Sequence, residues 1–187
     1  MRPTIYQGMY NVILRSIEAE LIPACRRYGL DVVVYNPIAG GLLSGKIAST
    51  DEKDIPTEGR FSDKFNNGAS RARYWSKGTF AAVDAIRETS AKHGIPMIEI
   101  ALRWLVHHSA LDVYGKEFHD GIIIGASSLG HLKSNLDDLA KEPLPKEILD
   151  DVDAAWLLAK VDTAPYWHLD LKYTYDTEKE IFGEGKK

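Results

Sequence analysis

Three short apolar segments constrain the fold of this chain more than any other feature of its sequence. They are TIYQG at residues 4–8, DVVVYN at 31–36 and GIIIG at 121–125. Each is rich in β-branched or aromatic residues, and its apolar residues run on without alternation, as in strands that helices cover on both faces. Parallel strands of this kind need long crossover connections. The sequence therefore predicts an α/β fold with a parallel sheet.

Helical periodicity fills the intervals between these strands. Residues 15–28 repeat apolar positions at helical spacing (Ile17, Leu21, Ala24 and Tyr28), with a kink or restart at Pro23 and an end at Gly29. Two further helices are expected at 79–93, ending at Gly94, and from Pro96 to Ser109. The region between the second and third strands thus supplies the helices of a crossover.

Two helices are expected after the third strand. The first carries a leucine stripe (Leu129, Leu132, Leu136 and Leu139), which predicts about three turns packing back on the sheet. The second, within residues 143–160, turns Ile148, Val152 and either Ala155 or Trp156 toward the core. The chain therefore continues to alternate strand and helix up to its last predicted element.

The strand count limits the architecture. The sequence contains no GxGxxG after a strand, which argues against the doubly wound dinucleotide fold. A complete (β/α)8 barrel has eight strands and about 250 residues, whereas this chain has 187 residues and three predicted strands. We therefore expect a partial (β/α)8 barrel of about the last three strand-helix units with a C-terminal extension, the first units lying upstream.

Composition excludes several partner classes. A net charge of −4 and an isoelectric point near 5.9 give no basic surface for nucleic acid or an anionic membrane. No apolar run approaches the roughly 18 residues of a membrane span, and residues 1–11 lack the apolar core of a signal peptide. With Cys25 as the one cysteine, expected to be a buried inert thiol, we expect a cytoplasmic protein.

No metal motif is present in the sequence. His107 and His108 are adjacent and diverge on a helix, and there is no HExxH, paired cysteine or acidic calcium loop. GxSxG is also absent, so a hydrolase of the nucleophile-elbow type has no support. The sequence therefore predicts neither a metal centre nor this type of hydrolase.

Residues 47–78 form a long connection that is expected to serve as a lid or binding loop. Loops of this length are uncommon in domains unless they have such a function, and the alternative is a disordered surface insertion. Arg60, Arg71, Arg73, Tyr74 and Trp75 favour the lid, because solvated linkers seldom combine aromatic residues with clustered arginines.

Two strand ends offer anion sites. After the second strand, Gly40 and Gly41 let backbone N–H groups approach a ligand and Lys46 adds a positive charge, although a tight structural turn explains the glycines equally well. After Gly125, Ser127 or Ser128 is expected to cap a helix, with Ser128, His131 and Asn135 on one polar stripe. Capping and solvation alone would also explain these residues. Two such sites at the same end of neighbouring strands favour a dinucleotide.

Several motifs together resemble the aldo-keto reductases. They are YQGMYN at 6–11, YNPIAGGLLSGK at 35–46, GRF at 59–61, SRARYW at 70–75, ALRWLVHHS at 101–109 and GASSLGHLKSN at 125–135. The resemblance runs from about residue 2 to residue 168 and points to the aflatoxin-aldehyde and succinic-semialdehyde reductase branch, in a fungal form. It implies that residues 1–168 are the C-terminal part of an NADP(H)-dependent barrel and residues 169–187 a tail.

The resemblance also implies roles for individual residues. Gln7 would hold the nicotinamide carboxamide, and Tyr35 would stack on the nicotinamide ring. The pyrophosphate would be wrapped by residues after the second strand, namely Asn36, Pro37, Ile38, Ala39, Gly40, Gly41, Leu42 and Lys46, with Arg60 from the lid. The adenosine end and its 2′-phosphate would contact Ser127, Ser128, His131 and Asn135, with His131 replacing a commoner glutamine. Arg73 would attract an acidic group of the substrate.

No catalytic residue is carried over from the family. Its tetrad of Asp, Tyr, Lys and His comes from the first four strands, and no tyrosine here lies in that motif. We therefore expect the complete protein to reduce aldehydes or ketones with NADPH and this chain alone to be inactive. The alternatives are a non-catalytic NADP(H)-binding or interaction module, associating with itself or another chain through open barrel edges, and an inert truncated gene product.

Overall fold

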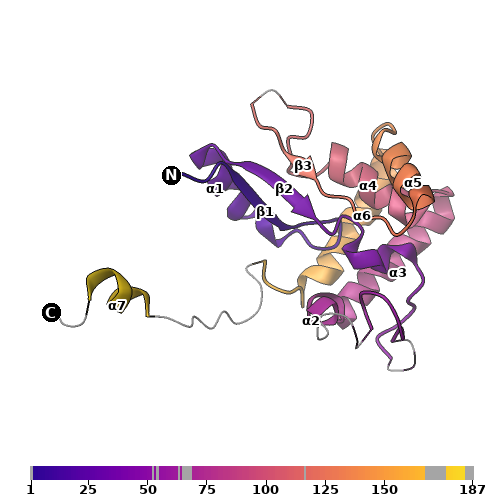
Figure 1. The fold of residues 1–187 in the computed structure, drawn as a ribbon. Helices are drawn as coiled ribbons and strands as arrows, with labels where there is room; N and C mark the ends of the chain where they lie inside the picture. Colours follow the sequence, from indigo (N-terminus) through magenta and orange to yellow (C-terminus); the bar gives the residue numbers. More distant parts are fainter. Residues whose placement is uncertain are drawn as a thin grey trace.

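The structure, a computed structural model, describes residues 2–51, 53, 55–62, 64, 69–115, 117–166 and 176–183. Part of the expected lid, residues 52, 54, 63 and 65–68, and most of the expected tail lie outside the described residues. Along the chain the elements are β1 (Ile5–Met9), η1 (Ser16–Glu18), α1 (Leu21–Tyr28), β2 (Asp31–Tyr35), η2 (Ala39–Ser44), α2 (Ala69–Tyr74), α3 (Lys77–His93), α4 (Met97–His107), β3 (Gly121–Ile122), α5 (Leu129–Leu139), α6 (Lys146–Lys160) and α7 (Thr177–Phe182) (Figure 1).

The three strands form a parallel sheet in the order β1, β2, β3. Gln7 pairs with Val33, and Met9 pairs with Tyr35. The third strand is two residues long instead of the expected five, because in the described part of the chain only β2 flanks it. One further hydrogen bond continues the pairing beyond β3, from Ile123 N–H to the Val34 carbonyl at 2.8 Å. Adjacent parallel strands with helical crossovers are consistent with a partial (β/α)8 barrel.

The two faces of the sheet differ in burial, which corrects the expectation of helices on both. Val32 and Val34 are fully buried on the face that α1 contacts. On the other face Val33 and Tyr35 are half-buried and Gln7 is exposed, while Met9 at the carboxyl end of β1 is buried. The apolar run predicts two covered faces because the side chains of β2 on the open face, such as Val33 and Tyr35, are also apolar or aromatic. In a closed barrel this open face would point inward.

The helix expected over residues 15–28 is broken into η1 and α1. Pro23 lies in the first turn of α1, where its missing N–H leaves no hydrogen bond unmade. The break shifts the helical phase, so the buried residues are Ile17, Ile22 and Cys25. Leu21 is half-buried against the core as expected, but the expected stripe is wrong at Ala24 and Tyr28, which are exposed. Gly29 ends α1 with φ +64°, as predicted.

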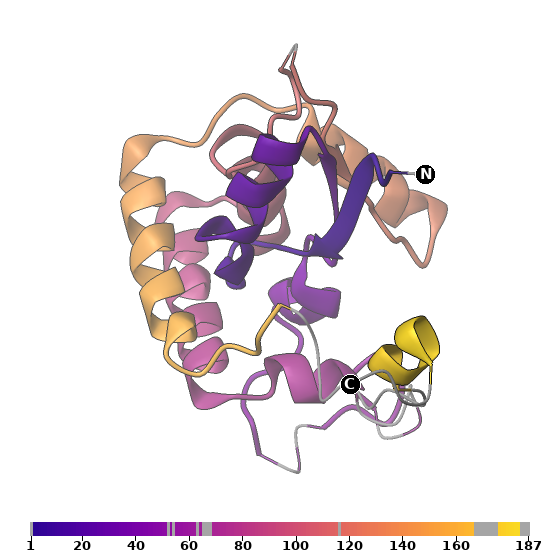
Figure 2. The same ribbon diagram turned by 90° about the vertical axis from the view of Figure 1, so that its left-hand side faces the viewer.

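Helices α3, α4 and α6 agree with the predicted pattern. Ser76 caps α3 by accepting a hydrogen bond from Thr79 N–H at 3.2 Å, and Gly94 ends it with φ +68°. Figure 2 shows α3 and α6 side by side, and α6 buries Ile148, Val152 and Ala155 as expected. Among the described residues, no helix combines the length and apolar character that crossing a lipid bilayer requires.

The leucine stripe of α5 does not pack on the sheet, which corrects a second expectation. Leu129 is 82% exposed and Leu136 is 51% exposed, while Asn135 and Asp138 are buried. α5 instead packs on α4. Lys141, just after α5, binds Asp138 at 2.8 Å and Glu99 of α4 at 2.6 Å, so ion pairs rather than leucines orient the helix.

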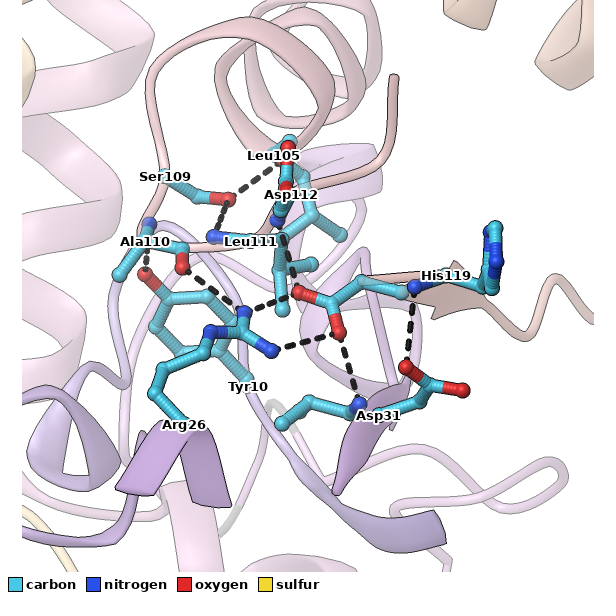
Figure 3. Close-up of polar contacts among 11 residues, drawn as sticks. Tyr10, Arg26, Asp31, Leu105, Ser109, Ala110, Leu111, Asp112 and His119 are labelled. Carbon is cyan, nitrogen blue, oxygen red and sulfur yellow. Dashed lines mark hydrogen bonds and ion pairs between the residues drawn. The ribbon is translucent and has the colours of Figure 1, made fainter. Parts of the chain in front are cut away.

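A carboxylate ties together the amino ends of β2 and β3. Asp120 is buried and accepts hydrogen bonds from the Arg26 guanidinium, from Val32 N–H at 2.7 Å and from Asp112 N–H at 2.7 Å. Figure 3 shows Arg26 and Asp112 converging there, next to the bond from His119 N–H to Asp31. Burial would raise the pKa of Asp120, but these donors outweigh it and lower the pKa.

Candidate functional site

The carboxyl ends of β1 and β2 carry the first two candidate residues on one face. The parallel register pairs Gln7 with Val33 and Met9 with Tyr35, so Gln7 and Tyr35 share the open face as diagonal neighbours. Gln7 is exposed and Tyr35 is half-buried. Both can therefore reach a ligand placed against this face of the sheet.

The glycine turn, residues 36–45, follows β2 and carries unusual backbone angles. Asn36 and Ala39 adopt positive φ values of 58° and 51°, and Gly40, Gly41 and Gly45 adopt 69°, 104° and 74°. A Cβ at Gly41 would meet no atom within 4 Å, so the main chain there borders open space. Such consecutive left-handed residues direct the backbone outward, as anion-binding turns do.

The side chains of this turn serve mainly to anchor it. Pro37, Ala39 and Leu42 are buried and Ile38 is half-buried. Hydrogen bonds from Ala39 N–H to the Asn36 carbonyl at 2.9 Å and from Gly41 N–H to the Ile38 carbonyl at 3.0 Å fix its shape. A ligand would therefore meet the backbone of the turn, as the sequence predicts for Gly40 and Gly41, while Lys46 beyond it is exposed.

Arg60 brings the two strand-end sites together. A Cβ at Gly125, after β3, would lie 3.7 Å from Arg60 Nη2, and a Cβ at Gly40 would lie 3.9 Å from Arg60 Cδ. The neighbouring Phe61 is buried against the same turn, since a Cβ at Gly40 would lie 3.5 Å from its ring. The Arg60 side chain thus reaches from the glycine turn to the residues that follow β3.

The start of α5 forms a small polar cluster. Ser128 caps the helix and accepts a hydrogen bond from His131 N–H at 3.1 Å, and Ser127 Oγ lies 3.0 Å from His131 Nδ1. Ser127, Ser128 and His131 are exposed, whereas Asn135 is buried. The predicted cap is confirmed, but the single polar stripe is wrong, because α5 turns Asn135 inward.

Two residues that the sequence analysis did not single out as site residues, Asn11 and Tyr74, meet beneath the glycine turn. Asn11 Nδ2 donates to the Tyr74 hydroxyl at 3.1 Å and to the Asn36 carbonyl at 3.0 Å. Burial raises the pKa of Tyr74 to about 12, so its hydroxyl stays protonated at neutral pH. The available signal was a polar residue just beyond the carboxyl end of a parallel strand, since Asn11 in YQGMYN lies two residues after the end of β1.

Arg73 and Cys25 also have predicted roles that the structure bears on. Arg73, the predicted substrate residue, is half-buried, and its buried Nε has no hydrogen-bond partner among the described residues. Cys25 is buried, and burial raises the pKa of its thiol, in agreement with an inert cysteine. The described residues contain no group of three His, Cys, Asp or Glu side chains placed to hold a metal ion.

Comparison with known proteins identifies similar sequences. A model of the Aldo/keto reductase family matches residues 1–157. An aldo-keto reductase of Pseudocercospora fijiensis is 40% identical over 166 residues, covering 89% of this chain and 55% of that protein. Aflatoxin B1 aldehyde reductase member 2 of Mus musculus is 39% identical over 171 residues, covering 88% and 45%. The chain spans about half the length of the curated relatives it matches.

Proposed function

The chain belongs to the aldo/keto reductase family, and from this membership and the site geometry we propose that it forms the cofactor-binding part of an NADPH-dependent reductase of aldehydes and ketones. The observation that carries the proposal is the position of Arg60. Its side chain runs from Gly40 to Gly125, so one cation lies between the ends of β2 and β3. A dinucleotide has a pyrophosphate to place between two such ends.

The nicotinamide and pyrophosphate have matching residues around the glycine turn. Gln7 and Tyr35 lie on the open face of the sheet, where an amide can bind the carboxamide and an aromatic ring can stack on the nicotinamide. The positive φ values and the open space at Gly41 suit a backbone that wraps phosphate groups. In this proposal the 47–78 segment is the lid that supplies Arg60.

Preference for NADP(H) over NAD(H) is assigned to the start of α5. Ser127, Ser128 and His131 are exposed around the helix N-terminus, where hydroxyl, imidazole and N–H groups suit a 2′-phosphate. Asn135 belongs to the same proposed set and lies buried on α5, one turn beyond His131. The adenosine end of the cofactor would lie at this helix.

The bound cofactor would supply a hydride to a carbonyl carbon, and this chain would hold the donor. The carbonyl oxygen also needs a proton, but the Tyr74 hydroxyl is buried and bound by Asn11. We therefore assign no catalytic residue in this chain. Arg73 is proposed as the substrate contact, and its guanidinium favours substrates that carry an acidic group.

Titration with NADPH tests the proposal. The full chain should show saturable quenching of tryptophan fluorescence, and Arg60→Ala should raise the Kd by roughly tenfold or more, since a charge-assisted contact with phosphate is lost. Arg27→Ala, which removes an exposed arginine on α1, serves as the control and should bind normally. The absence of saturable binding by the unmodified chain would refute the proposal.

Association through the sheet is the second candidate function. Ile5 on β1 is 55% exposed and Ile123 beside β3 is 42% exposed, and both border strand edges that no described strand covers. Exposed apolar edges favour pairing with another chain. The chain would then act as a binding or interaction module.

A further inference from the structure

Asn11 uses every polar atom of its side chain at the carboxyl end of β1. Its Oδ1 accepts a hydrogen bond from Ile13 N–H at 3.2 Å, and its Nδ2 donates to the Asn36 carbonyl and the Tyr74 hydroxyl. Its main chain is bonded in both directions with Leu14, at 3.1 and 3.0 Å. The residue is fully buried, so a ligand on the open face does not touch it. Asn11 thus holds the surrounding structure in place and does not itself bind a ligand.

The Asn36 carbonyl accepts hydrogen bonds from both sides of the turn. Ala39 N–H donates to it from within the turn, and Asn11 donates to it from the segment that follows β1. Asn36 has a φ of 58°, a conformation that asparagine tolerates but that still needs support. Asn11 therefore stabilises the residue through which the chain passes from Tyr35 to the glycine turn.

Tyr74 brings the 47–78 segment into this network. It is the last residue of α2 and is almost completely buried, with its ring edge-on to Phe61 at a centroid distance of 6.3 Å. Phe61 in turn lies against Gly40. Figure 2 shows η2 beyond the carboxyl end of β1 and α2 farther along the same side of the molecule. The Tyr74 side chain therefore contacts both supports of the turn, Asn11 through its hydroxyl and Phe61 through its ring.

We propose that Asn11 and Tyr74 are positioning residues for the dinucleotide: their hydrogen bond couples docking of α2 to the conformation of Asn36. Formation of this bond holds Tyr35 and the glycine turn ready for the nicotinamide and pyrophosphate without contacting either group. This inference rests on the proposed cofactor function. It assigns the coupling to one hydroxyl and one amide, both buried.

The substitution Tyr74→Phe tests this coupling, because it removes the hydroxyl and keeps the ring against Phe61. The full chain and the variant are titrated calorimetrically with NADPH and with adenosine 2′,5′-bisphosphate, which lacks the nicotinamide half. The Kd for NADPH should rise about three- to tenfold, the factor that loss of one neutral hydrogen bond produces. The Kd for the bisphosphate should not change. Tyr28→Phe, on exposed Tyr28, should alter neither Kd.

The two ligands separate the outcomes. Unchanged binding of both by Tyr74→Phe overturns the inference and leaves the proposed function standing. Equal weakening of both also overturns it, because Tyr74 then acts through the stability of the whole fold. If the unmodified chain binds neither ligand, the proposed function fails and the inference fails with it.

A double-mutant cycle provides a second check on the same pair. In an Asn11→Ala background, Tyr74→Phe should weaken NADPH binding less than it does in the unmodified chain, because the hydroxyl has already lost Asn11 and keeps only its hydrogen bond with the Asn36 side chain. Full additivity of the two substitutions would show that the residues act independently and would contradict the coupling.

Discussion

Gly41 shows at the residue scale how this site depends on backbone conformation rather than on side-chain space. Its φ of 104° is accessible to glycine and strained for any residue with a Cβ, yet that Cβ would meet no atom within 4 Å. Asn36 and Ala39 accept positive φ without being glycine. The local cost is offset by the buried contacts of Leu42, Leu43 and Phe61 around the turn.

We predict that Gly41→Ala lowers the free energy of unfolding by about 1–2 kcal/mol, because the backbone strain has no compensating contact. Urea unfolding followed by tryptophan fluorescence measures the change. Gly130→Ala in α5 is the matched control, since its Cβ would lie 3.8 Å from Ser128 Oγ and its φ is not positive. That variant should gain up to about 1 kcal/mol in stability, and a loss equal to that of Gly41→Ala would refute the backbone explanation.

At the scale of elements, polar contacts fix several helices and strands that apolar periodicity places incorrectly. Ion pairs of Lys141 with Glu99 and Asp138 determine which face of α5 packs against α4. Arg103 of α4 adds a hydrogen bond to the Glu142 carbonyl at 2.8 Å, just after α5. Asp120 likewise joins α1 to the amino ends of β2 and β3. The Asp120 contacts lie at the amino ends of the strands, whereas the glycine turn follows the carboxyl end of β2. In parallel barrels the amino end usually serves stability.

The lowered pKa of Asp120 predicts a pH dependence of stability. A carboxylate whose pKa is lower in the folded protein stabilises the fold above its unfolded value, near 4, and this stabilisation is lost as the pH falls through the folded value. We expect Asp120→Asn to cost about 2–4 kcal/mol at pH 7, because the Arg26 charge loses its partner. We also expect the variant to lose less stability than the unmodified chain on acidification.

Urea unfolding at several pH values from 7 to 3 measures this difference. Asp137→Asn, on an exposed position of α5, is the control and should change stability by less than about 0.5 kcal/mol. If the free energies of unfolding of Asp120→Asn and of the unmodified chain change equally with pH, Asp120 does not titrate in this range with a shifted pKa.

At the scale of the whole molecule, the open face and the uncovered edges of the sheet determine how the chain can associate. Val33 and Tyr35 are only half-buried on that face, and strand edges lie next to the exposed Ile5 and Ile123. Family members have (β/α)8 barrels, in which neighbouring strands would cover such edges. An apolar edge without a partner strand tends to pair with another chain.

We predict that the chain associates at micromolar concentrations and that Ile123→Lys reduces the association by placing a charge at the β3 edge. Size-exclusion chromatography with light scattering measures the molar mass against concentration. Leu158→Lys is the control, since Leu158 on α6 is similarly exposed at 44% and lies outside the sheet. A molar mass equal to one chain at every concentration would contradict the prediction, as would equal effects of both variants.

Much of the architecture was predictable because it depends on local chemistry. The β-branched runs predicted β1 and β2, and Gly29 and Gly94 ended their helices as expected because left-handed caps favour glycine. Ser128 was recognisable as a cap for a similar local reason. The family resemblance, carried by motifs that are contiguous in sequence, is confirmed by the match over residues 1–157.

The sequence by itself thus determined the order of the strands and of the longer helices, several caps and the family, all of which depend on neighbouring residues. It did not predict α2 within the expected loop or α7 within the expected tail. Only the tertiary structure decided which face of each element is buried, because the phase shift after η1 and the ion pairs of α5 depend on contacts distant in sequence. It also brought Arg60 between Gly40 and Gly125 and placed Asn11 against Tyr74. Asn11 and Tyr74 are 63 residues apart in the sequence. Such a contact produces no periodic pattern along the chain, because the two residues meet only in the folded structure.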